Sequence, residues 1–147
     1  MTSGLALGVG VGYQVVGFGG QVLYYEALGS GFWVVPYVGS GVIGTNGKFR
    51  GGIAGGVMGA WGRAHRIVLD MSAGVGAAQT RTSPLTGNVI DVRTRYGVSV
   101  ALGYEYVADG GFWVRPTAGV TYLVDDPGAN NSRWLPALNV TLGYKIW

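Results

Sequence analysis

The sequence predicts an all-β fold: a membrane-spanning, up-and-down barrel of eight antiparallel strands in a single domain, residues 1–147. Large apolar residues alternate with small or polar ones along most of the chain, as in the opening stretch GLALGVGVGYQV (4–15). Such period-two alternation indicates strands. Turn signals divide the chain into eight segments, most of them 12 residues or longer. Strands of soluble proteins average about five to six residues, whereas membrane-spanning strands need about 9–11, so the lengths favour a membrane protein.

Composition supports this class and excludes others. Of the 147 residues, 48% are hydrophobic and 12% charged, whereas about a quarter of a soluble domain is charged. The net charge of +3 comes without a basic cluster, which argues against a nucleic-acid partner. The absence of cysteine excludes disulfides and thiolate metal sites. No apolar run approaches the ~18 residues of a membrane helix, and we expect no secretory signal in this sequence.

The first four segments are residues 4–16, 21–28, 32–43 and 48–61. In the first, glycine or alanine alternates with leucine or valine, and the glycine-rich run 17–20 predicts the turn that follows it. Gly-Ser-Gly at 29–31 and Thr-Asn-Gly at 45–47 predict the next two turns, because Asn-Gly is a strong hairpin signal.

The last four segments are residues 66–79, 89–107, 112–124 and 133–147. The turn 62–65 leads into the first of them, and the polar stretch TRTSPLTGN (80–88) separates it from the next. Asp-Gly-Gly at 109–111 and DDPGANNS at 125–132 predict the remaining turns.

The third and seventh segments resemble each other. GFWVVPYVG (31–39) reappears 80 residues later as GFWVRPTAG (111–119), and each copy follows a strand that contains Tyr-Glu. Duplication of a half-barrel and independent use of a favourable hairpin both explain this repeat.

The bulky face of each segment is expected to face lipid. In the sixth segment, for example, Val98, Val100 and Leu102 alternate with Ser99 and Ala101. An eight-stranded lumen holds little more than a packed set of side chains, so roughly forty large apolar residues would not fit inside. With the bulky residues outside, glycine and polar residues line the narrow lumen. The sheet must close, because an open edge in lipid leaves backbone groups unsatisfied.

Aromatic residues on the bulky face predict two girdles at the membrane surfaces. Tyr96 and Tyr106 are ten residues apart, as are Phe112 and Tyr122. Ten residues at ~3.4 Å rise and ~45° tilt span roughly 24 Å, close to the ~25 Å apolar band of such barrels. The expected girdle residues are Tyr13, Phe49, Trp61, Tyr96, Tyr104, Tyr106, Phe112, Tyr122, Trp134 and Tyr144.

Charged residues on the small face predict a network inside the lumen. Buried charges must be paired or hydrated. We expect the carboxylates to pair with basic groups across the lumen, either as a plug that rigidifies the barrel, which we favour, or as a gated polar pathway. The residues are Glu26, Arg50, Asp70, Arg95, Glu105, Arg115 and Lys145.

No other constellation predicts chemistry. His65, the only histidine, lies in the turn sequence Gly-Arg-Ala-His-Arg and lacks the nucleophile and orienting group of a hydrolase. Arg63 and Arg66 flank this turn, and we expect them to be solvated, with contact to anionic headgroups as the alternative. We predict no catalytic residue, no metal site and no cofactor.

In strand count, alternation and girdles the chain resembles the eight-stranded outer-membrane barrels of the OmpA/OmpX type, over its whole length. LNVTLGYKIW (138–147) looks like their terminal recognition signal, although Trp147 falls on the inward parity while Tyr144 and Ile146 face outward. The resemblance implies an outer-membrane location. It also implies that the termini and the turns 29–31, 62–65 and 108–111 are periplasmic, with outer loops at 17–20, 44–47, 80–88 and 125–132.

We therefore expect a non-enzymatic integral outer-membrane protein that acts as a structural element, anchor or interaction partner. The partners implied are outer-membrane lipid and a protein or second copy on the lipid-facing wall, where Gly51, Gly55 and Gly59 leave a flattened strip. The alternative is a narrow channel for ions or small solutes. Surface adhesion is less favoured, because the outer loops are short.

Overall fold

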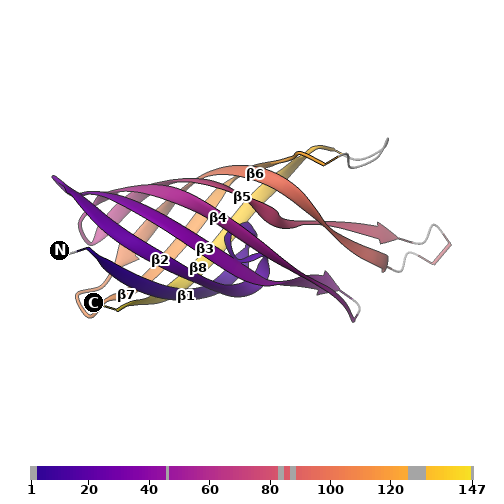
Figure 1. Cartoon of the computed structure of the whole chain (residues 1–147), viewed down its shortest axis with the longest axis horizontal. Helices are drawn as coiled ribbons and strands as arrows, with labels where there is room; N and C mark the ends of the chain where they lie inside the picture. The colour runs from indigo at the N-terminus through magenta and orange to yellow at the C-terminus, as the bar shows by residue number, and fades with distance from the viewer. Residues whose placement is uncertain (1–2, 46, 83–84, 87–88, 126–131, 147) are drawn as a thin grey trace.

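Eight antiparallel strands form a closed barrel in the computed structural model, which describes residues 3–45, 47–82, 85–86, 89–125 and 132–146 (Figure 1). Each strand pairs with the next along the chain, and β8 pairs with β1 to close the sheet. A short 3-10 helix, η1, lies between β1 and β2. The elements are β1 (Gly4–Gly12), η1 (Tyr13–Val15), β2 (Gly17–Gly29), β3 (Phe32–Thr45), β4 (Lys48–Gly62), β5 (His65–Thr82), β6 (Val89–Val107), β7 (Phe112–Leu123) and β8 (Trp134–Ile146).

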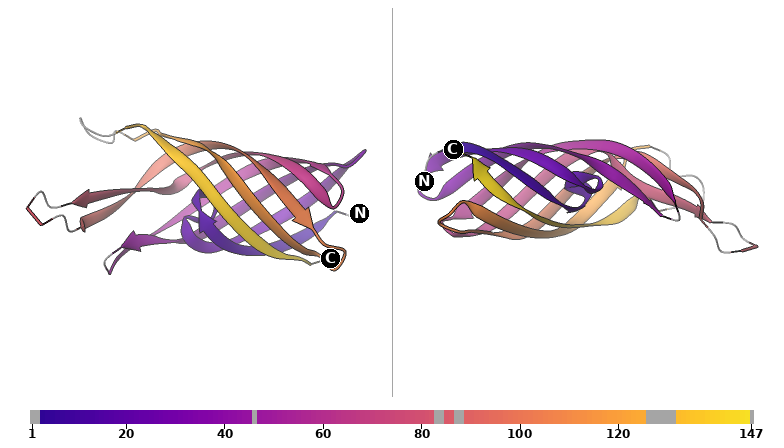
Figure 2. Two further views of the ribbon diagram at one scale, coloured as in Figure 1. Left: turned by 180° about the vertical axis from the view of Figure 1, so that it is seen from behind. Right: turned by 90° about the horizontal axis from the view of Figure 1, so that it is seen from below.

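Both termini lie at one end of the barrel, as an even number of strands requires (Figures 1 and 2). We call this the terminal end, and the opposite one the loop end. At the loop end the β3–β4 and β5–β6 hairpins extend past the barrel (Figure 1). The pairing of β4 with β5 stops at Ile53 and Val75, and that of β6 with β7 stops at Gly97 and Leu123. The expected loops 80–88 and 125–132 fall partly outside the described residues, as does Trp147.

No helix in the described part of the chain has the length and apolar character needed to cross a membrane.

Apolar side chains cover the outside of the barrel, and small or polar ones point inward. On β8, Leu138 is 68% exposed, whereas the neighbouring Asn139 and Thr141 are 3% and 0% exposed. The same alternation places valines and leucines on the outside of β1 and β6. An apolar exterior of this extent is stable in lipid rather than in water.

Gly8 of β1 makes room for a tryptophan in the lumen. Trp113 from β7 is fully buried. A Cβ atom on Gly8 would lie 2.6 Å from its ring, and one on Gly143 of the adjacent β8 would lie 2.5 Å from the ring and 2.1 Å from the Leu7 carbonyl oxygen. Glycine is therefore required here by close packing, and the large buried ring compensates for its poor strand propensity.

The expected turn at residues 17–20 is wrong. β1 ends at Gly12, η1 turns into the lumen, and residues 17–20 belong to β2. Val16 ends η1 in the left-handed region with φ 54°, and Gly17 follows with φ 83°. A Cβ on Gly17 would lie 2.4 Å from the carbonyl oxygen of Val42 on β3. The glycine run predicted a turn, but its first member is needed for this close approach to the neighbouring strand.

Most of the expected girdle residues lie on the outside. Phe49, Trp61, Tyr96, Tyr104, Tyr106, Phe112, Trp134 and Tyr144 are exposed. Tyr122 is half-buried, and its ring packs edge-on against Trp134 at 5.0 Å between centroids. Tyr13 does not belong to a girdle: it is buried in the lumen, because the chain leaves β1 one residue earlier and turns inward.

The outward position of Val140 leads to a prediction. Val140 lies six residues after Trp134 and four before Tyr144, near the middle of the apolar band. In phospholipid vesicles, Val140→Arg should lower the free energy of unfolding by about 2–4 kcal/mol. The buried Thr141→Ser, which keeps its hydroxyl, should lose only about 0.5–1.5 kcal/mol, the cost of one methyl group. Equal losses in urea titrations of the two variants would contradict the assignment of the faces.

Candidate functional site: the filled lumen

The η1 segment closes the lumen toward the loop end. Tyr13, Gln14 and Val16 are buried inside the barrel. The Tyr13 hydroxyl lies within hydrogen-bond distance of two carbonyl oxygens, 2.5 Å from that of Gly97 and 3.0 Å from that of Gly74. The backbone N–H of Gln14 donates to the Asn139 side-chain oxygen at 3.0 Å. Contacts to β5 and β6 thus hold the turn across the lumen from its own strands, and the contact to β8 joins it to the neighbour of β1.

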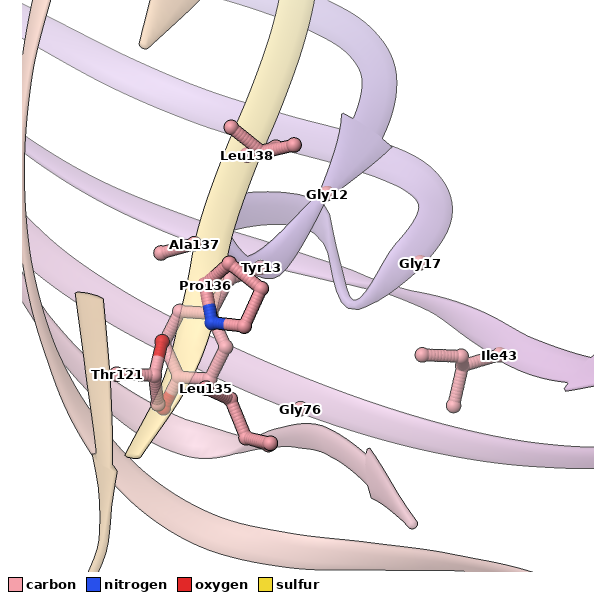
Figure 3. A pocket seen from close by; sticks show the side chains of 10 residues that line it. All are labelled: Gly12, Tyr13, Gly17, Ile43, Gly76, Thr121, Leu135, Pro136, Ala137 and Leu138. Atoms are coloured by element: carbon pink, nitrogen blue, oxygen red, sulfur yellow. The ribbon is translucent and has the colours of Figure 1, made fainter. Parts of the chain in front are cut away.

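A recess of about 340 Å³ lies beside η1. Figure 3 shows the Tyr13 ring among Thr121, Leu135 and Pro136, at the edge of this recess. Its lining is mostly apolar or glycine and holds none of the charged groups expected in the lumen. None of the described side chains that line the recess is charged, so we assign it no chemical role.

Toward the terminal end, Glu105 is the centre of an ion-pair network. Its Oε1 atom accepts a hydrogen bond from Arg66 Nη1 at 2.8 Å. Its Oε2 atom lies 2.8 Å from Arg115 Nη2 and accepts hydrogen bonds from Arg115 Nε at 3.0 Å and from the Tyr25 hydroxyl at 2.6 Å. All four side chains are buried. Four strands, β2, β5, β6 and β7, each contribute one of these groups.

Aromatic faces accommodate the excess positive charge of this region. Three cations (Arg66, Arg115 and Lys145) lie near one carboxylate. Lys145 Nζ lies 3.9 Å from the centroid of the Tyr25 ring and 4.9 Å from that of Trp33. Arg66 Cζ lies 4.6 Å above Trp33, and Arg115 Cζ lies 4.6 Å above Trp113. Cation–π attraction strengthens when the pair is desolvated, as it is here.

Arg66 is the network member that sequence reasoning missed. The expectation that it is a solvated turn residue is wrong, since Arg66 is buried and pairs with Glu105. Its Nε atom also donates to the Arg63 carbonyl oxygen at 2.8 Å, which fixes the β4–β5 turn to the lumen. Arg66 has the same strand parity as Asp70, and this signal was available in the sequence.

The structure separates the other expected network residues. Asp70 is buried and accepts hydrogen bonds from Tyr37 at 3.2 Å and Ser72 at 3.4 Å. Arg50 is exposed and Arg95 is half-buried, both toward the loop end and away from Glu105.

The inward placement of Glu26 is wrong. Leu23 and Tyr25 of β2 are the buried residues, so Glu26 lies on the outward parity. Glu26 precedes the Trp33 of its repeat copy by seven residues, whereas Glu105 precedes Trp113 by eight. A one-residue offset of this kind places a side chain on the opposite face of the sheet.

The strands that precede the two repeat copies meet across the lumen in the Glu105 network. Tyr25 and Glu105 are 80 residues apart, as are Trp33 and Trp113. The first pair joins by a hydrogen bond across the lumen, and each tryptophan lies under a guanidinium group. Tyr25 and Glu105, which join by this hydrogen bond, thus occupy equivalent positions relative to the two repeat copies.

His65 lies outside the lumen, on the exterior at the terminal end. Its Nδ1 atom hydrogen-bonds the Tyr104 hydroxyl, and its ring lies 5.1 Å from that of Tyr106. Within the described residues there is no group of three or more His, Cys, Asp or Glu side chains that could hold a metal ion.

No model of a known protein family matches the chain, and no curated protein is similar to it in sequence. The fold is similar to the solved structure of the outer membrane protein Ail of Yersinia pestis, determined in a phospholipid bilayer nanodisc. The match covers 98% of this chain and 99% of that one, with a TM-score of 0.54 and 11% sequence identity. The chain thus has the fold of an eight-stranded outer-membrane barrel, as its alternation and strand count predicted.

The network leads to a second prediction. Glu105→Gln removes the carboxylate shared by Arg66 and Arg115 and should lower the free energy of unfolding by about 3–5 kcal/mol, because it leaves buried cations uncompensated. Asp109→Asn, an exposed change in the β6–β7 turn, should alter it by less than about 0.5 kcal/mol. Urea unfolding in vesicles, followed by tryptophan fluorescence, measures both. A loss in Glu105→Gln no larger than that of the control would show that the network does not stabilise the barrel.

Proposed function

We propose that this chain is a non-enzymatic integral outer-membrane protein whose closed barrel serves as a structural element or anchor. The similarity in fold to an outer-membrane barrel supports the location. The observation that carries the proposal is that side chains fill the lumen at two levels: η1 toward the loop end, and the Glu105 network toward the terminal end.

Each of these two levels opposes the passage of ions for a different physical reason. At the η1 level, Tyr13 and Val16 pack with Leu123 and Ala54 in an apolar cluster, and the Tyr13 hydroxyl and the Gln14 N–H are already hydrogen-bonded within the barrel. At the network level, two guanidinium groups and a carboxylate hold one another at hydrogen-bond distances, with Trp33 and Trp113 packed against them. An ion would have to displace paired buried charges, which is costly.

Planar-bilayer conductance tests this proposal. Folded, detergent-purified protein should insert stably and give no discrete current steps, with denatured protein as the control. Arg115→Ser should stay silent as well, because η1 still closes the lumen. Discrete steps in the unmodified protein whose size changes in Arg115→Ser would establish the alternative, a narrow channel lined by the lumen charges.

A second candidate function, contact with a protein partner through the lipid-facing wall, is favoured by three glycines of β4. A Cβ atom on Gly51, Gly55 or Gly59 would approach no atom closer than 3.8, 3.4 and 3.6 Å, respectively. The inward Gly52 and Gly56 of the same strand would instead meet backbone oxygens at 1.9 and 2.5 Å. Packing within the barrel therefore requires glycine at the inward positions but not at the outward ones. Contact with a neighbouring molecule would account for the outward glycines.

Substitution in the strip tests the contact. If a second copy or partner packs there, Gly55→Leu should convert the complex to monomer in mild detergent, since the new side chain fills the strip. Val57→Leu, on the same face of the same strand, is the matched control and should leave the complex intact. Light scattering gives the masses. Unmodified protein that is always monomeric and free of partners would rule out this function.

A further inference from the structure

A mostly apolar recess with aromatic walls lies on the outside of the barrel at the terminal end, and His65 and Tyr104 are at its edge. Outward side chains of four neighbouring strands form a row there, because Phe32 pairs with Trp61, Trp61 with Ile67, and Ile67 with Tyr104. Trp61 and Ile67, in the middle of this row, are 71% and 70% exposed. A recess of about 390 Å³ is lined by Trp61, Gly62, His65, Arg66, Ile67 and Tyr104.

An exposed arginine lies at this corner of the barrel. The β4–β5 turn carries the exposed Arg63, and His65 begins the next strand. The other two turns at this end have no basic residue: Gly-Ser-Gly at 29–31 is neutral, and 108–111 carries Asp109. Arg63 lines a second recess on the side of the turn that faces β3, beside Phe32 and Gly62. The cationic turn thus lies between the two recesses.

The backbone of this turn is held in place from within the barrel, and the polar pair beside it is held by contacts on the outside. Arg66 donates to the Arg63 carbonyl oxygen and is itself held by Glu105. The His65 ring hydrogen-bonds Tyr104 and packs against the Tyr106 ring at a tilt of 42°. When the Tyr104 hydroxyl donates to Nδ1, His65 keeps an Nε2–H donor; when Nδ1–H donates to the hydroxyl oxygen, Tyr104 keeps its O–H. In either arrangement the pair offers one donor to an anion.

We propose that this corner binds the phosphate of a glycerophospholipid in the adjacent leaflet. Trp61 and Tyr104 belong to the aromatic girdle, which lies at headgroup depth in membrane proteins. The Arg63 guanidinium and the His65–Tyr104 pair would hold the phosphate oxygens, because Arg suits charge-assisted bonds to phosphate. The exposed faces of Trp61 and Ile67 would pack against the acyl chains. An outward recess at this depth meets lipid before any soluble anion, which favours a phospholipid as the occupant.

Nuclear magnetic resonance of the one histidine tests the proposal directly. Protein folded in a maltoside detergent, which contains no phosphate, is titrated with dihexanoyl phosphatidylglycerol while the His65 ring signals are recorded. These signals should shift saturably. Arg63→Gln should weaken the apparent affinity about fivefold, as expected for one surface cation. Arg133→Gln, an exposed arginine at the loop end, is the matched control and should leave the affinity unchanged.

The remaining arms separate the other outcomes. Inorganic phosphate at the same concentration should cause no saturable shift; an equal shift would show a free-anion site and overturn the assignment to lipid. The absence of saturation by the lipid, or the same affinity in Arg63→Gln as in the unmodified protein, would also overturn it. Circular dichroism confirms that each variant is folded. The lipid titration does not depend on whether the barrel conducts ions or binds a partner. The proposed function and the lipid site can therefore fail independently of each other.

Discussion

The interaction on which the lumen depends is the double ion pair of Glu105 with Arg66 and Arg115. An isolated charge in so narrow a space would be prohibitively costly, so the two guanidinium groups require a common carboxylate. With Tyr25, which donates to the same carboxylate, the network links four of the eight strands. It also fixes where Trp33 and Trp113 lie, because each ring packs under one of the guanidinium groups.

The second constraint is volume. Two tryptophans, several tyrosines and two arginines occupy the interior of an eight-stranded barrel, so glycine is required where a large side chain lies against the wall. Gly8 and Gly143 therefore give space to Trp113. The inward glycines and the buried aromatic rings therefore depend on each other, because the rings fill the space that the glycines leave.

The two constraints together support the proposal that function resides on the surface. A lumen filled by η1 and by paired charges leaves the apolar wall, the hairpins of the loop end and the rim of the terminal end to meet other molecules. The basic corner around Arg63 is coupled to the interior by Arg66, whose guanidinium contacts both the turn and Glu105. Trp33 provides a second link, because its indole N–H donates to the Gly62 carbonyl oxygen at 3.3 Å. The Glu105 network inside the lumen thus also fixes the backbone of the turn that carries Arg63.

The sequence by itself determined the fold class, the eight strands and most of the outward residues, because period-two alternation and strand length are local properties. It also identified Glu105, Arg115 and Lys145 as inward, since the strands that carry them alternate without interruption. Only the tertiary structure decided which groups pair, because residues from β2, β5, β6 and β7 meet through the closure of the sheet. Glu26 and Tyr13 were misplaced for the same reason: one residue of offset in a strand or turn reverses the face of a side chain, and the register that fixes it comes from the neighbouring strands.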